Sequence, residues 1–235
     1  MSSVVPTRSC DVCFATKEML RKLYTCKACE EPCYCSRECQ RIDWPNHRLI
    51  CENNARILRN TAPRCVAIWK DLTLWSQKYK DITASASIAA TLKNPDWDEK
   101  FPDTVLVIRL GYSPHVARRV DRFTLLWVGI QRLEGSLRRL RDQTDVEAFH
   151  ARREHMARVG EEAYGDGFVG VSTICIVAGE GRSGGMTKVC SSSYTKEDIQ
   201  KVKESAQGRH SESWADDLGV ALGRSSGSPV PVMLL

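Results

Sequence analysis

Residues 10–51 read CDVCFATKEMLRKLYTCKACEEPCYCSRECQRIDWPNHRLIC, and their cysteine pattern determines how the N-terminal part of the chain can fold. Seven of its cysteines and its one histidine fall into four short-spaced pairs: Cys10 with Cys13, Cys26 with Cys29, Cys35 with Cys39, and His47 with Cys51. Two ligands this close can reach one Zn²⁺ from a single turn or helix start, so four pairs make two tetrahedral sites. We predict two structural zinc ions, because four protein ligands leave no open position for water or substrate.

The second half of this stretch carries a more specific pattern. Tyr34-Cys35-Ser36-Arg37-Glu38-Cys39-Gln40 is followed by Asp43-Trp44 and then by His47 and Cys51. This arrangement resembles the MYND-type zinc finger. The resemblance implies a cross-braced fold, in which the first pair shares a metal with the third pair and the second with the fourth. The implied ligand sets are Cys10, Cys13, Cys35 and Cys39 for one ion and Cys26, Cys29, His47 and Cys51 for the other.

The resemblance also implies a site for a protein partner. Gln40 and Trp44 are four residues apart on a predicted helix and therefore share a face. MYND fingers use such residues, beside a small strand, to hold short proline-containing peptides in an extended form. An indole offers a flat apolar surface to proline, and an amide can bind a peptide carbonyl or N–H. Lys27, which stands where some family members have a serine, completes the predicted peptide site. The alternative that Trp44 packs between the two metal sites stays open.

Composition limits the remaining function classes. The other four of the 11 cysteines lack ligand spacing, which indicates reduced thiols in an intracellular protein of the nucleus or the cytoplasm: Cys33, Cys65, Cys175 and Cys190. We find neither an N-terminal targeting pattern nor a run of roughly 18 apolar residues, so we expect no secretion and no membrane insertion. The formal charge of +5 falls to about +2 once two thiolate-bound zinc ions are included. Nucleic acid is therefore an unlikely partner.

We predict four segments along the chain. These are a disordered leader over 1–9, the finger over 10–51, a domain of unknown function over 52–207, and a loosely ordered tail over 208–235. Within the finger, Pro45 is expected to end a short helix that begins after Ser36 and to start a second one. In the larger domain the hydrophobic periods predict helices over 64–80 and 83–92, strands over 105–110, 123–130, 168–178 and 187–194, and a Thr195-capped helix over 196–206. Residues 230–235 are expected to add an edge strand or to dock apolar side chains. Grouped helices and antiparallel strands favour an α+β class.

The leading hypothesis is a non-enzymatic adaptor, with transcriptional regulation as one setting. An enzyme in the C-terminal domain is an alternative, because residues 179–184 match the nucleotide-binding pattern G-x-G-x-x-G after a predicted strand. The residues that follow are strand-like, whereas a phosphate-binding loop needs a helix there. We therefore favour a flexible loop over a nucleotide site. Neither the Asn-His-Cys motif of SET methyltransferases nor its Tyr-containing partner is found downstream, which disfavours that class. His150 and His155 are interpreted as surface histidines. The clustered arginines 118, 119, 138, 139 and 141 are interpreted as solubilising. A nucleic-acid-binding regulator is the other alternative.

Overall fold

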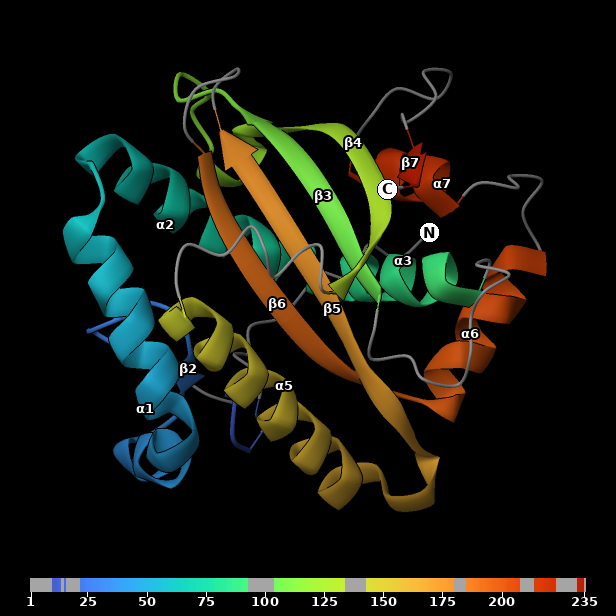
Figure 1. Ribbon diagram of the computed structural model, residues 1–235, viewed down its shortest axis with the longest axis horizontal. Coiled ribbons are helices and arrows are strands. Elements are labelled where there is room, and N and C mark those ends of the chain that lie inside the picture. Colours follow the sequence, from blue (N-terminus) through green and yellow to red (C-terminus); the bar gives the residue numbers. More distant parts are fainter. Residues whose placement is uncertain are drawn as a thin grey trace.

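The computed structural model describes residues 10–13, 15, 22–92, 104–133, 143–179, 185–207, 214–222 and 232–234 (Figure 1). The predicted leader over 1–9 lies outside these residues, as does the core of the glycine-rich segment, 180–184. Among the described helices, none combines the length and hydropathy that crossing a membrane requires.

The finger consists of a minimal sheet and the start of a long helix. Strands β1 (Tyr24–Thr25) and β2 (Cys33–Tyr34) pair antiparallel, and α1 follows over Arg37–Asn60. Because α1 is continuous through Pro45, the predicted helix break there is wrong. Pro45 and Arg41 are both exposed, so the Arg41 carbonyl that loses its helical partner can be hydrated instead. The helix also carries metal-ligand positions on both sides of the proline, which favours an unbroken axis.

The larger region is built on a five-stranded sheet in the order β6-β5-β3-β4-β7. Its strands are β3 (Thr104–Tyr112), β4 (Phe123–Arg132), β5 (Phe168–Gly179), β6 (Gly185–Thr195) and β7 (Val232–Leu234). Antiparallel hairpins join β3 to β4 and β5 to β6, which agrees with the antiparallel strands expected from the sequence. The two hairpins meet through a parallel β3–β5 pair, and β7 runs parallel to β4. The α+β class is confirmed, and the sheet is mixed.

Helices cover both faces of the sheet (Figure 1). On one face lie α2 (Pro63–Lys78) and α3 (Lys80–Leu92), and on the other lies α5 (Gln143–Tyr164). Alternate residues of β3 separate accordingly, since Leu106 and Ile108 join the α2 and α3 core while Val105 and Val107 join Phe149 of α5. Burial on both faces explains why β3 reads as a continuous apolar run.

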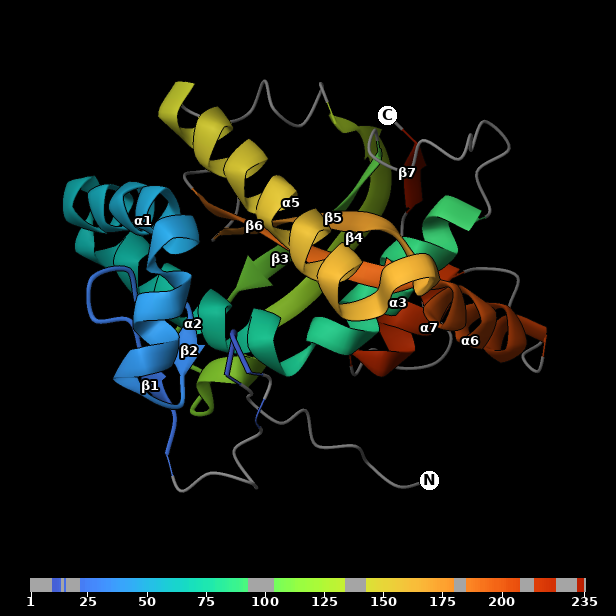
Figure 2. The ribbon, with the colours of Figure 1, turned by 90° about the horizontal axis from the view of Figure 1, so that it is seen from below.

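The C-terminal part adds two helices and the edge strand. Helix α6 (Lys196–Gln207) begins with the predicted cap, because the Thr195 N–H and hydroxyl donate to Asp198 while the Thr195 hydroxyl accepts from the Asp198 N–H. Helix α7 (Trp214–Ala221) was not predicted, and it places Ala215 and Leu218 in the core. The two helices lie near the end of the molecule opposite the finger (Figure 2). β7 confirms the expected edge strand.

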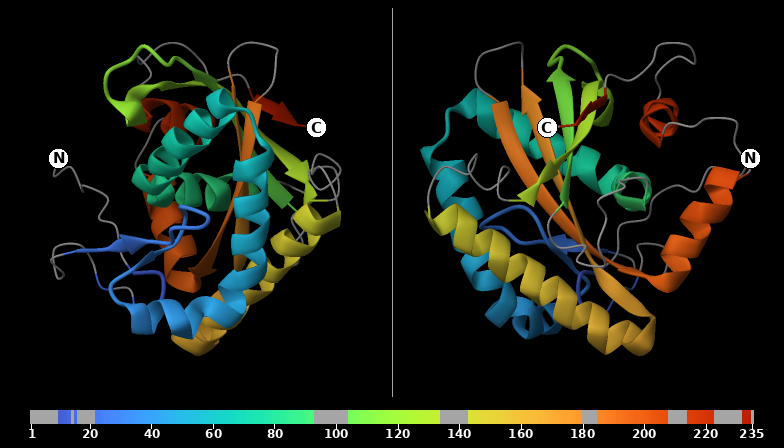
Figure 3. Two further views of the ribbon diagram at one scale, coloured as in Figure 1. Left: turned by 90° about the vertical axis from the view of Figure 1, so that its left-hand side faces the viewer. Right: turned by 45° about the vertical axis from the view of Figure 1, so that its right-hand side comes forward.

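The finger is joined to the larger region along α1. Helix α1 runs beside α5, and the 24 residues of α1 extend past the predicted domain boundary at 51 (Figure 3). The division into domains stays a prediction. The physical consequence is that the helix carrying His47 and Cys51 is also part of the packing against the sheet domain.

Candidate metal centre

The eight predicted ligand residues gather into two groups, each with its ligand atoms within 4.8 Å of one another. The first group is Cys10, Cys13, Cys35 and Cys39, in which the Sγ of Cys35 lies 3.5 Å from that of Cys13 and 3.4 Å from that of Cys39. These residues come from the first and third pairs in the sequence. The grouping is therefore cross-braced, as the family resemblance implied.

The second group is Cys26, Cys29, His47 and Cys51, from the second and fourth pairs. The Sγ atoms of Cys26 and Cys51 are 3.7 Å apart, and the Cys29 Sγ lies 3.4 Å from the His47 Nε2. All four residues are buried, whereas Cys13 of the first group is exposed. The second group thus lies deeper in the protein than the first.

These spacings fit tetrahedral zinc. Thiolates at about 2.3 Å from a central Zn²⁺ lie about 3.8 Å apart along each tetrahedral edge, close to the sulfur separations found here. With four protein ligands in each group, each ion is structural. The finger holds two structural zinc ions.

Local backbone geometry positions the ligands. Ser36 caps α1, and its hydroxyl accepts a hydrogen bond from the Cys39 N–H at 3.2 Å. The Cys26–Cys29 turn is closed by two bonds of 2.9 Å, from the Cys26 N–H to the Pro32 carbonyl and from the Glu30 N–H to the Cys26 carbonyl. Glu30 takes a left-handed φ of 59° to complete this turn.

The two metal loops are also bonded to each other. Asp11 donates its N–H to the Cys33 carbonyl at 2.9 Å, and its carboxylate accepts from the Cys33 N–H at 2.6 Å. The buried Tyr34 donates its hydroxyl to Asp43 of α1 at 2.6 Å. Cys33 belongs to neither ligand group, which agrees with its exclusion from the metal sites.

The thiols differ in how readily they ionise without metal. Burial opposes ionisation of Cys10, but backbone hydrogen bonds from Cys13, Val12 and Cys35 lower its pKa to about 7. Burial raises the pKa of Cys29 and of Cys51, so zinc must displace protons that these thiols hold firmly. Zinc binding at the buried site therefore releases protons and weakens as pH falls.

The predicted peptide residues lie on the surface of the finger. Trp44 is 43% exposed, and its ring packs edge-on against His47 with 6.1 Å between centroids. Gln40 is half-buried one turn earlier on α1, and Lys27 is exposed in the Cys26–Cys29 turn. Trp44 thus contacts a metal ligand and still presents surface to solvent. Tyr24 and Ile42 are further large apolar side chains that the finger exposes.

Within the described residues, two lysines of the sheet domain pair with carboxylates of the finger, and both carboxylates lie beside Cys29. Glu30 lies 3.0 Å from Lys70 of α2, and Glu31 pairs with Lys188 of β6. Lys188 is only 3% exposed, and its ammonium also lies 4.8 Å from the Trp69 ring centroid. The finger and α1 meet α2, α5 and β6 at a junction that we call the seam. The contact between Glu31 and Lys188 is its central polar contact.

The charge state of Glu31 reflects this pairing. Burial would raise its pKa, but the Lys188 ammonium, with Arg152 and a hydrogen bond from Asn54, lowers it to about 2. Lys188 was not predicted as functional. The available signal was its alternation with Met186 and Cys190, which places a lysine on the core face of a strand.

Further polar contacts of the seam come from α5. The His155 Nε2 lies 3.7 Å from Asp43, and Arg158 donates to the Asn46 side chain at 2.6 Å. His155 is half-buried against α1, so its interpretation as a surface histidine is wrong, whereas His150 is exposed as predicted. Burial lowers the pKa of His155.

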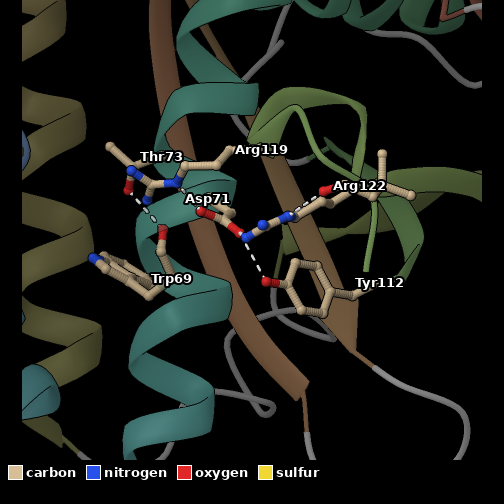
Figure 4. Close-up of polar contacts among 7 residues, drawn as sticks. Trp69, Asp71, Thr73, Tyr112, Arg119 and Arg122 are labelled. Carbon is tan, nitrogen blue, oxygen red and sulfur yellow. Dashed lines mark hydrogen bonds and ion pairs between the residues drawn. The ribbon is translucent and has the colours of Figure 1, made fainter. Parts of the chain in front are cut away.

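A second buried polar cluster lies in the sheet domain (Figure 4). Asp71 of α2, 2% exposed, accepts hydrogen bonds from the Tyr112 hydroxyl at 2.7 Å and from Arg122 at 2.8 Å, and it also pairs with Arg119. Arg119 therefore fixes the β3–β4 connection to α2. The interpretation of Arg119 as a solubilising charge did not include this ion pair. Burial opposes ionisation of Asp71, but these donors together lower its pKa. Three side chains of the sheet domain bind this buried carboxylate and tie α2 to the β3–β4 connection, which indicates a structural role.

The glycine-rich segment does not lead into a helix. β5 ends at Gly179 and β6 begins at Gly185, and the two strands pair antiparallel from those residues onward. A phosphate-binding loop of the dinucleotide type needs a helix N-terminus after the glycines. The prediction of a strand after this segment is confirmed, and the segment itself lies largely outside the described residues.

Comparison with known proteins agrees with the geometry of the finger. A family model described as MYND finger matches residues 10–51. N-lysine methyltransferase SMYD2 of Bos taurus is 52% identical over 42 residues, which are 18% of this chain and 9% of the relative. SMYD2-A of Xenopus laevis is 43% identical over 54 residues, 23% of this chain and 12% of the relative. SMYD2 of Mus musculus gives the same identity and coverage.

The match is confined to a small part of each protein. The chain spans about a tenth of the length of the curated relatives it matches. No solved structure matches the chain. The similarity therefore bears on the finger. Residues 10–51 of this protein are a MYND finger, a protein-interaction module built on two zinc ions in cross-braced order.

Proposed function

We propose that the protein is a non-enzymatic intracellular adaptor whose MYND finger holds a short, extended peptide of a partner protein, with proline as a favoured residue. Gln40, Trp44 and Lys27 form the peptide site. The proposal is carried by the packing and exposure of Trp44. Its indole packs against the His47 ring, and 43% of the residue surface is still exposed. A rigid, exposed indole is suited to stacking on a prolyl ring.

The small sheet supports the same proposal. Among the described residues, β1 pairs with β2 alone, so its other edge offers backbone N–H and carbonyl groups to an added strand. Tyr24 of β1 is 54% exposed, and the Lys22 ammonium lies 5.1 Å from its ring centroid. An extended peptide along this edge would meet an aromatic ring as well as unpaired backbone groups.

The sheet domain is proposed to supply a second surface. The relatives are named as lysine methyltransferases, but the shared sequence is the finger and its immediate surroundings, which supports a recruiting role and carries no argument for methyl transfer. A role in transcriptional regulation is one setting for such an adaptor.

The test separates recognition from folding. Proline-containing peptides are selected from a displayed library with the zinc-loaded full chain, and the selected peptides are titrated against Trp44→Ala. Loss of a buried anchor costs an interface about 2 kcal/mol or more, so we expect about a thirtyfold loss of affinity with two zinc ions retained. Ile42→Ala is the matched control, because Ile42 is exposed on the same helix but two residues away and therefore on another face.

Two results would contradict the proposal. Wild-type affinity in Trp44→Ala with its zinc intact would place the peptide on another surface. Loss of zinc in Trp44→Ala would show that the indole serves the metal site.

A further inference from the structure

The seam contains a cavity of about 210 Å³, bounded by the finger, α2, α5 and the edge strand β6 and called the seam cavity below. A protein cavity of about 150 Å³ is known to accommodate benzene, so this one has room for a somewhat larger small molecule. Asp11 and Lys80 line it and are exposed, which places its mouth between the finger and the start of α3.

Polar groups line this cavity without using all their hydrogen-bonding capacity. The Nε of Arg152 and the Oγ of Ser191 are buried atoms that have no hydrogen-bond partner among the described residues. Ser191 as a whole is 6% exposed. Buried polar atoms are nearly always hydrogen-bonded, so these two atoms have free capacity to bond to polar groups of whatever fills the cavity, water included.

The charges around the seam cavity restrict what that molecule can be. Its charged lining comprises three acids and three bases: Asp11, Glu31, Asp43, Lys80, Arg152 and Lys188. Glu31 and Lys188 pair with each other. Within the described part of the chain, the remaining two carboxylates form no ion pair with Lys80 or Arg152, although all four side chains line one space. Both carboxylates have other partners, because Asp11 accepts from the Cys33 N–H and Asp43 accepts from the Tyr34 hydroxyl and lies 3.7 Å from the His155 Nε2. The cavity is thus lined by both signs of charge without an Asp–Lys80 or Asp–Arg152 contact.

We propose that the seam cavity binds a small zwitterion of the amino-acid class, with its carboxylate on Arg152 and Lys80 and its ammonium on Asp11 and Asp43. A ligand with a single charge would meet one favourable pair and one repulsive pair, whereas a zwitterion complements both. The planar guanidinium of Arg152 is suited to a carboxylate, which it can bind through two parallel hydrogen bonds. This site lies inside the seam, apart from the exposed Trp44, and does not depend on the proposed peptide site.

The probes are free amino acids at millimolar concentration, from glycine to glutamate and lysine, added to the zinc-loaded full chain. Thermal unfolding and titration calorimetry give the shift and the affinity. Matched probes with one charge, acetate and methylamine, are run beside them. We expect at least one amino acid to raise the melting temperature and to bind at least tenfold more tightly than either single-charge probe.

The variants locate the site. Arg152→Met is expected to weaken the binding at least tenfold, and Lys80→Met, at the exposed mouth, to weaken it several-fold. Arg153→Met is the matched control, because Arg153 is the next residue on α5, stacks on Phe149 and does not line the cavity. If Arg152→Met fails to fold, Lys80→Met decides the location.

Three results would overturn the proposal. The first is an unchanged melting temperature with every amino acid, which would leave water as the content of the cavity. The second is equally tight binding of acetate or methylamine. The third is an unchanged affinity for the amino acid in a folded Arg152→Met or in Lys80→Met.

Discussion

The finger and the sheet domain are held together by different physics. The buried apolar cluster of the finger consists of three metal-ligand cysteines and Tyr34, so little apolar surface is buried apart from the metal sites. The sheet domain buries aromatic and branched side chains on both faces of a five-stranded sheet. A stretch of about forty residues cannot bury enough apolar surface to fold alone, so the finger depends on zinc, whereas the sheet domain has a core of its own.

This difference predicts that removing a ligand affects the finger more than any other single change. Cys29→Ala should lose the zinc ion of the second site and weaken the first, because the two ligand sets are interleaved along the chain. Metal analysis should find two zinc ions in the wild type and at most one in the variant. Hydrogen exchange should increase throughout α1 up to Cys51 and much less in β3. One zinc ion in the wild-type protein would contradict the two-site structure.

The next largest effect is expected where the two regions meet. Glu31→Gln keeps the shape of the side chain but leaves the Lys188 ammonium buried without its carboxylate, which typically costs about 3–5 kcal/mol of stability. Lys188→Met should cost clearly less, because Met fills the space beside Trp69 and brings no buried charge. Denaturant unfolding of both variants measures this difference in the free energy of unfolding.

The same pair tests whether finger and sheet domain unfold together. Since Glu31 is two residues from Cys29, chelation of zinc should disturb β6 through Lys188 in the wild type and less in Lys188→Met. Equal stability of Glu31→Gln and Lys188→Met would show that the ion pair does not hold the seam. Lys70→Met is a control, because the Glu30–Lys70 pair is 42% exposed on each side and contributes at most about 1 kcal/mol.

A smaller effect, limited to the sheet domain, is expected at Asp71. Asp71→Asn should cost about 2–3 kcal/mol, because hydrogen bonds to a buried carboxylate are lost while Arg119 and Arg122 remain partly hydrated. The pKa of Asp71 is lowered, so its contribution is present above about pH 4 and is lost as pH falls through the folded-state value. The stability difference between wild type and Asp71→Asn should therefore shrink in acid. Zinc content should stay the same in both proteins at neutral pH, and a loss of zinc in the variant would contradict a role confined to the sheet domain.

The sequence predicted the metal sites of the finger more completely than the topology of the sheet domain, for a physical reason. The two ligands of a pair are close in the sequence, so a pair such as Cys26 with Cys29 indicates a metal site directly. The strands were also found, because β3 and β5 are buried on both faces and read as apolar runs. Their parallel pairing could not be predicted, because it depends on a crossover that brings residue 108 beside residue 176. The same limit hid the contact between Glu31 and Lys188, whose residues are 157 positions apart.

The polar clusters show where a sequence signal existed and was underused. Asp71 lies on the apolar face of a predicted helix, next to Ile68 and Leu72. A buried carboxylate in such a position needs hydrogen-bond or ion-pair partners. Its partners Arg119 and Arg122 lie between β3 and β4. Arg119 was interpreted as a solubilising charge, and Arg122 was not singled out. Pro45 gave the opposite error, because the sequence predicted a break where solvation of one exposed carbonyl and metal ligands on both sides keep the helix whole.

The smallest effect is expected at Cys33, which lies inside the ligand stretch but outside both ligand groups. Its thiol is buried in β2, 3.8 Å from the Thr25 hydroxyl, so a serine in its place can keep that contact at the cost of placing a more polar atom in a buried position. Cys33→Ser should therefore keep two zinc ions and lose about 1–2 kcal/mol of stability. Cys35→Ser, two residues further, is the matched control and should lose a metal ligand with its ion. If Cys33→Ser released a whole zinc ion while Cys35→Ser did not, the third ligand pair would begin at Cys33, and the cross-brace would have to be redrawn.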